Sequence, residues 1–173
     1  MKPLLENLLN LTEEDIFKPF SVEEVIQKRL KGCTLNSDGT YSSESDVDLS
    51  DLGLTILPVK FKEVKGDFDC SYNKLTSLEG APEYISGDFW CGNNQLTSLE
   101  GAPEKVSGGF YCYHNKLTSL KGAPKEIGGD FYCHYNNLTS LEGCPKEVGE
   151  NFYCSYNPVS VDELEKTIKR NYL

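Results

Sequence analysis

Cysteine recurs every 21 residues through most of this chain, and its neighbours recur with it. A phenylalanine stands two residues before each of these cysteines, an asparagine stands three residues after it, and two leucines follow in four of the five copies. Self-similarity at a fixed period of about 20 to 50 residues is the signature of a stacked solenoid. Solenoid proteins commonly work by presenting an extended surface, so the repeat predicts both the fold and the kind of function.

Each repeat, which we call a rung, opens with a short β-strand such as Phe89-Trp90-Cys91. Successive strand residues point to opposite sides, so Phe89 and Cys91 share one side and Trp90 takes the other. Because phenylalanine and cysteine are the recurring positions, we expect them to face the core with the leucines and Val106. A 21-residue unit has no room for a long helix on the return segment, which we expect to be extended or a single turn.

The repeats predict a solenoid over residues 46–158. Its first rung is degenerate, with Val47, Leu49 and Leu52 standing where later rungs have phenylalanine, cysteine and asparagine. End repeats depart from the pattern because one side has no neighbouring rung. Four full rungs and a partial one follow: 67–87, 88–108, 109–129, 130–150 and 151–158.

The preceding segment, residues 1–45, predicts a helical cap and a polar lead-in. Leucines are dense over residues 3–11, and Ser21 with Glu24 forms a capping box that opens a further helix. The dipeptide Asp38-Gly39 then predicts a tight turn within a small hairpin.

Residues 159–173 predict a capping helix at the other end, opened by a second capping box from Ser160 to Glu163. Helices at both ends would cover the apolar sides of the terminal rungs, as solenoids require.

The recurring asparagine predicts a structural ladder. An inward asparagine offers two N–H donors and a carbonyl acceptor to backbone groups left unpaired where the strand turns. We expect the stacked amides to tie neighbouring rungs together. The ladder residues are Asn73, Asn94, Asn115, Asn136 and Asn157.

The chain is acidic, with a formal net charge of −10 and a pI near 4.7. This charge disfavours nucleic acid, whose binding depends on neutralisation of phosphates by Lys and Arg, and favours a protein partner with a basic patch. The first residues lack the pattern of a secretory signal, and no stretch approaches the ~20 apolar residues that span a bilayer. We therefore expect a soluble cytoplasmic protein, with a monomer favoured and self-association possible.

Seven cysteines are present without any C-x-x-C pair, so zinc-site spacing is absent. We expect reduced thiols that pack as small apolar side chains, and we expect no cofactor and no metal.

The pattern F-x-C-x-x-N-x-L-x-x-L resembles the leucine-rich-repeat consensus L-x-L-x-x-N-x-L over residues 46–158. The short repeats are similar to those of bacterial type III secreted effectors, although the effectors carry a proline-rich L-P-x-L-P phrase on the back. The phrase Leu-Thr-Ser-Leu-Glu-Gly-Ala-Pro, followed by Gly-Asp-Phe-x-Cys, looks more like leucine-rich-repeat proteins of large tailed bacteriophages. The resemblance implies an α+β solenoid arc with a parallel sheet on its concave face. It also implies binding to a host bacterial protein, such as a defence or regulatory factor.

Candidate binding residues occupy the outward strand positions, which the fold leaves free to vary. The first rungs carry mainly acidic side chains there, and the later rungs carry aromatic ones. The candidates are Asp67, Asp69, Asp88, Trp90, Tyr111, Tyr113, Asp130, Tyr132, His134 and Tyr153.

Two explanations fit each part of this surface. Aromatic residues on strands can reflect β-propensity and mutual stacking, or they can form an interface hot spot, which we favour because so many are contiguous. The aspartates could hold a divalent cation between strands ~4.8 Å apart, or, as we favour, they are solvated or face the basic residues of a partner.

Catalysis has weak support in the sequence. Cys133 and His134 are adjacent in a strand and therefore point to opposite sides. Cys112 and His114 are two residues apart, but Cys112 is expected to be buried, where a thiol is inert. We expect a non-catalytic binding module without catalytic residues. The alternatives are a self-associating structural component and, less favoured, a small enzyme.

Overall fold

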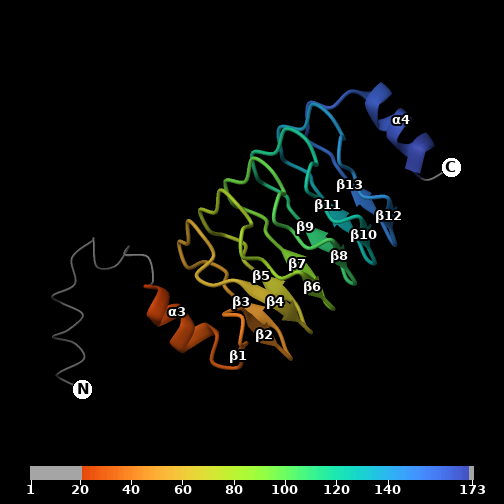
Figure 1. The fold of residues 1–173 in the computed structure, drawn as a ribbon. Helices are drawn as coiled ribbons and strands as arrows, with labels where there is room; N and C mark the ends of the chain where they lie inside the picture. Colours follow the sequence, from red (N-terminus) through yellow and green to blue (C-terminus); the bar gives the residue numbers. More distant parts are fainter. Residues whose placement is uncertain (1–20, 172–173) are drawn as a thin grey trace, which may run out of the picture.

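The computed structural model describes residues 21–171, with side chains described as far as residue 167. Within these residues the chain forms a β-solenoid of about five turns at 21-residue spacing, with one helix at each end of the described part (Figure 1). The helices are α3 (Val22–Arg29) and α4 (Val161–Asn171). None of the helices in this part of the chain has the length and apolar character needed to cross a membrane.

The strands that carry the Phe-x-Cys motif form a six-stranded parallel sheet, which we call the front sheet. Equivalent residues pair at 21-residue intervals, so Phe68 lies beside Phe89 and Asp69 beside Trp90. Its strands are β3 (Val47–Asp48), β5 (Phe68–Asp69), β7 (Phe89–Trp90), β9 (Phe110–Tyr111), β11 (Phe131–Tyr132) and β13 (Phe152–Tyr153).

The return segments form a second, seven-stranded sheet, the back sheet. Its strands are β1 (Thr34–Leu35), β2 (Tyr41–Ser43), β4 (Phe61–Val64), β6 (Tyr84–Ile85), β8 (Lys105–Val106), β10 (Glu126–Ile127) and β12 (Glu147–Val148). Only the β1–β2 pairing is antiparallel, and it forms the hairpin predicted around Asp38-Gly39.

An extended return segment was expected, but its pairing into a sheet was not. Val64, Ile85, Val106 and Ile127 recur at the same interval and are all buried. Stacking these β-branched side chains brings the return segments into register, and backbone bonds such as Gly128 N–H to Val106 C=O (3.0 Å) then form between them.

The core lies between the two sheets. Each inward position of the repeat contributes one column of stacked apolar side chains, with one side chain from each rung. Phe68, Phe89, Phe110 and Phe131 are completely buried, and Phe89 stacks on Phe110 with ring centroids 5.1 Å apart. The first and second leucines of each full rung are buried beside them. Burying a phenylalanine or leucine side chain contributes about 1.5–3 kcal/mol, so each rung supplies stability only when a neighbour covers it.

The asparagine ladder connects consecutive rungs through hydrogen bonds at its amide groups. Asn115 Oδ1 accepts the N–H of Leu96 (2.9 Å), and its Nδ2 donates to Cys91 O in the same preceding rung (3.0 Å). The same Nδ2 also lies 3.2 Å from Cys112 O within its own rung. Equivalent bonds are made by the asparagines of the other rungs: Asn73, Asn94, Asn136 and Asn157.

Helix α3 lies at the N-terminal end of the stack (Figure 1) and begins at the predicted capping box. Ser21 Oγ accepts the Glu24 N–H (3.2 Å), and Glu24 Oε2 accepts the Ser21 N–H (2.9 Å). Val25 and Leu30 are buried, so this end of the chain packs into the core. The helix predicted over residues 3–11 lies outside the described residues.

At the other end, Ser160 Oγ accepts the Glu163 N–H (3.3 Å), and α4 begins at Val161, directly after this serine. Phe152 and Cys154 in the last rung remain only partly buried. Alternation within the strands predicts a buried cysteine in each of the five Phe-x-Cys motifs, and for Cys154 this is wrong because its rung has a neighbouring rung on one side only.

Asn115→Ala should lower the free energy of unfolding by about 1–3 kcal/mol, because it leaves buried backbone groups without hydrogen-bond partners. The control is Gln95→Ala, at an exposed position of a neighbouring rung, which should change it by less than about 0.5 kcal/mol. Urea unfolding measures both, and equal midpoint shifts for the two variants would contradict the ladder's role.

The cysteines should separate into two reactivity groups. Cys70, Cys91, Cys112 and Cys133 are buried, and burial raises the pKa of their thiols. Ellman's reagent should label these only after denaturation, whereas Cys33, Cys144 and Cys154, which are half-buried, should react more quickly. Rapid native labelling of all seven thiols would contradict the register of the front sheet.

Candidate binding surface

The outward residues of the front sheet form a continuous stack of aromatic rings. The ring centroids of Trp90 and Tyr111 lie 3.7 Å apart with an angle of 5° between the planes. Tyr111 to Tyr132 is 5.2 Å, and Tyr132 to Tyr153 is 4.3 Å. The rings therefore cover one another's faces along the column and leave mainly their edges uncovered.

A second column, one position after each cysteine, carries Tyr113 and His134, whose rings stack at 5.2 Å. Tyr113 lies across Gly92 of the preceding rung, where an added Cβ would be 2.8 Å from the ring. Tyr113 also makes a side-chain hydrogen bond with Tyr72, two rungs away. Glycine at position 92 thus provides the space that lets this tyrosine lie flat along the solenoid.

A third column, which the sequence analysis missed, stands immediately before each ladder asparagine. His114 stacks on Tyr135 at 4.4 Å, and Tyr135 stacks on Tyr156 at 4.2 Å. These residues stand two positions after the inward cysteine, so a continued strand, in which side chains alternate between the two sides, would have turned them inward as well. The chain instead adopts a left-handed conformation here, with φ between 50° and 55°, which turns them outward and the next asparagine inward. The available signal was the aromatic side chain repeated just before the asparagine.

The left-handed conformation makes the tyrosines of this column unusual. It costs non-glycine residues roughly 1–2 kcal/mol and suits asparagine or aspartate best, as Asn93 and Asp51 illustrate in other rungs. Tyr72, Tyr135 and Tyr156 nevertheless occupy it, and they are 58%, 42% and 70% exposed. Neither the backbone nor the core requires a tyrosine at these positions. Strained, exposed aromatic side chains point to a role on the surface.

We call the three columns together the aromatic surface. It brings together the six predicted aromatic and histidine candidates and adds four residues. Its members are Tyr72, Trp90, Tyr111, Tyr113, His114, Tyr132, His134, Tyr135, Tyr153 and Tyr156.

The aspartates that stand directly before the phenylalanines hydrogen-bond to the backbone of the next rung, which the sequence did not reveal. Asp67 Oδ1 accepts the backbone N–H of Asp88 (2.8 Å), and Asp88 Oδ1 accepts that of Gly109 (2.6 Å). Asp130 Oδ1 likewise accepts the Asn151 N–H (2.9 Å). One oxygen of each carboxylate thus joins two rungs, and their negative charge borders the aromatic surface.

Gly109 interrupts this aspartate column, and the structure explains why. A Cβ at residue 109 would lie 2.6 Å from the hydroxyl oxygen of Tyr111, so the phenol occupies the place of the missing side chain. Burial, followed by the charges of Asp88 and Asp130, raises the pKa of Tyr111 to about 12. Tyr111 is therefore anchored among carboxylates and remains a neutral hydrogen-bonding group at physiological pH.

The residues considered for catalysis are separated by the sheet. Cys133 is buried while His134 faces outward, and burial raises the pKa of the Cys133 thiol far above its usual value. The pKa of His134 is lowered, first by burial and then by the nearby His114. Among residues 21–167, no group of three or more His, Cys, Asp or Glu side chains is arranged to hold a metal ion.

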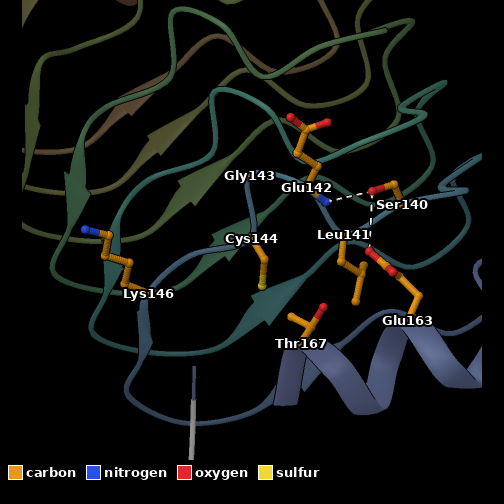
Figure 2. A pocket seen from close by; sticks show the side chains of 8 residues that line it. All are labelled: Ser140, Leu141, Glu142, Gly143, Cys144, Lys146, Glu163 and Thr167. Carbon is orange, nitrogen blue, oxygen red and sulfur yellow. Dashed lines mark hydrogen bonds between the residues drawn. The ribbon is translucent and has the colours of Figure 1, made fainter. Parts of the chain in front are cut away.

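A polar, open hollow of about 810 Å³ lies beside α4 (Figure 2). Leu141, Cys144 and Thr167 contribute to its lining, and Ser140 Oγ lies 3.5 Å from Glu163 Oε1 across it. No residue of the aromatic surface lines this hollow.

Comparisons with known proteins found no matching family model, no matching curated protein and no matching solved structure.

Gly109→Asp, which restores the repeating aspartate, should lower the free energy of unfolding by roughly 1–3 kcal/mol because the new side chain collides with Tyr111. In a Tyr111→Ala background the same change should cost much less. Urea unfolding of the four proteins in this double-mutant cycle measures the coupling. A stabilising Gly109→Asp in the wild-type background would contradict the packing described.

Proposed function

We propose that this protein is a non-catalytic binding module that engages a protein partner through the aromatic surface. The observation that carries the proposal is the set of parallel aromatic stacks on the solvent side of the front sheet. Tyrosine and tryptophan supply large contact area at low cost in side-chain entropy, and they dominate interface hot spots. The exposed tyrosines with left-handed backbone add to the argument because folding alone gives no reason for them.

Charge favours a partner with a basic patch. The net charge of −10 opposes binding to nucleic acid, although stacked aromatics by themselves would suit exposed bases. Three aspartates lie along the border of the aromatic surface: Asp67, Asp88 and Asp130. Each uses Oδ1 to accept a backbone N–H of the next rung, and its other carboxylate oxygen takes no part in that bond. Such a border steers a basic protein toward the surface and rejects acidic ones.

The resemblance noted in the sequence extends the proposal. It assigns the chain to leucine-rich-repeat arcs like those of large tailed bacteriophages, with α3 and α4 as end caps. On this proposal the protein acts in the cytoplasm of a bacterial cell, where it occupies a host defence or regulatory factor.

The test compares two double variants in capture from bacterial lysate and then in binding to the purified captured protein. Tyr111→Ala with Tyr132→Ala should reduce binding at least about 100-fold, because hot-spot truncations cost 2 kcal/mol or more each. Circular dichroism and the melting temperature should change little, since an outward stacked pair contributes roughly 0.2–1 kcal/mol.

The matched control is Glu79→Lys with Glu100→Lys, two exposed residues in the turns that lead to the back sheet. This pair should leave binding within about twofold of wild type, as expected for changes outside the interface. Loss of binding in the control, with binding intact in the tyrosine variant, would place the interface elsewhere and overturn the proposal.

A second candidate, self-association, is favoured by one observation. The last rung leaves Phe152 and Val148 only partly buried at the edges of both sheets, where a second copy could add strands. Light scattering over a range of low concentrations distinguishes the two. A stable oligomer that persists on dilution would favour a structural component, and a monomer would favour the binding module.

A further inference from the structure

We propose that Trp90 and Asp69 form an arginine-binding site, at which a guanidinium group of the partner stacks on the free face of Trp90 and pairs with the Asp69 carboxylate. The inference depends on the proposed function and names the chemistry of the partner at one point of the aromatic surface.

The free face of Trp90 results from its position at the end of the first aromatic column. One face of the indole is covered by Tyr111 at 3.7 Å. The other face points toward β5, and no ring in the described part of the chain stacks on it, since the preceding rung has Asp69 in the paired position. Within this column of the front sheet, the acidic and aromatic halves therefore meet between β5 and β7 (Figure 1).

The Asp69 carboxylate is held in a fixed orientation. Its Oδ1 accepts the backbone N–H of Ser71 (2.8 Å) and the hydroxyl of the same serine (2.5 Å). No hydrogen bond within residues 21–167 is recorded for its Oδ2. A cation at this place would meet an oriented carboxylate on the strand next to that of Trp90, with the two backbones ~4.8 Å apart.

Tyr113 forms a side wall of the site. Its ring lies across Gly92, two residues after Trp90 in the same rung, and it makes a side-chain hydrogen bond with Tyr72. Burial is the main cause that raises the pKa of Tyr113, with smaller contributions from Tyr72 and from the charge of Asp69. Asp69 pairs with Trp90 across β5 and β7, and Tyr113 lies across Gly92 two residues after Trp90, so the three side chains border one part of the surface.

Arginine fits this arrangement better than other cations. Its planar guanidinium can lie parallel to an indole face while its N–H groups donate to a carboxylate in the same plane. A lysine ammonium is a more strongly hydrated point charge and gains less from stacking. A divalent metal needs several oxygen ligands, and this site offers a single carboxylate.

The chain provides its own reporter, because Trp90 is the only tryptophan. The full-length protein is titrated with a blocked tetra-arginine peptide while its tryptophan emission is recorded. A blocked tetra-citrulline peptide, which has the same shape without the charge, is the matched ligand control. The arginine peptide should change the emission with saturation, and the citrulline peptide should not. A tetra-lysine peptide should bind more weakly than tetra-arginine.

Asp69→Asn should lower the affinity for tetra-arginine about fivefold or more, a loss of roughly 1 kcal/mol from one charge pair. The amide oxygen of asparagine can still accept the Ser71 bonds, so the urea midpoint should remain close to that of wild type. The control Glu100→Gln removes the same charge from an exposed turn and should change the affinity by less than about twofold.

Equal binding of the arginine and citrulline peptides would overturn the site, as would equal losses in Asp69→Asn and Glu100→Gln. Binding of lysine as tight as that of arginine would overturn the stacking on Trp90. These failures are separable from failure of the proposed function. If the peptide fails but the captured partner still requires Tyr111 and Tyr132, only the arginine site is wrong.

Discussion

The architecture depends on the amide ladder formed by one asparagine in each rung. Each amide accepts an N–H from the preceding rung and donates to carbonyls of both rungs, so it satisfies backbone groups at the point where the front strand ends. To bring the asparagine inward, the residue before it adopts a left-handed conformation. The hydrogen-bonding requirement of the core therefore determines which side chain is turned to solvent one position earlier.

This geometry accounts for the form of the candidate binding surface. Sheet register places equivalent residues one strand spacing apart, so aromatic side chains at any outward position stack as a column. Two glycines adapt the columns locally: Gly92 lets Tyr113 lie along the solenoid, and Gly109 makes room for the Tyr111 phenol among the aspartates. The surface is thus rigid before any partner arrives, which reduces the entropy lost on binding. Its stacked rings expose mainly edges, and for this reason the uncovered face of Trp90 stands apart as a place for a cation.

Repetition made much of the fold predictable. The inward phenylalanines and cysteines followed from alternation within a strand and the leucines from repetition, and the first capping box, the Ser160 bond at the start of α4 and the hairpin followed from local sequence. Alternation fails beyond the cysteine, because a left-handed residue breaks it, and so Tyr135 and Tyr156 were missed as surface residues. The aspartates were recognised as an outward acidic column, but their bonds to the next rung depend on a spacing between rungs that no single repeat contains.

The sequence by itself determined the period, the inward set and the identity of the outward columns as far as the residue after the cysteine, because each of these is a property of one 21-residue unit. The tertiary structure decided what happens between units. It paired the return segments into a back sheet, covered one face of Trp90 while leaving the other open, and left the last rung partly exposed beside α4. These features depend on which neighbour each rung has, and the packing of neighbouring rungs is fixed only when the whole stack has formed.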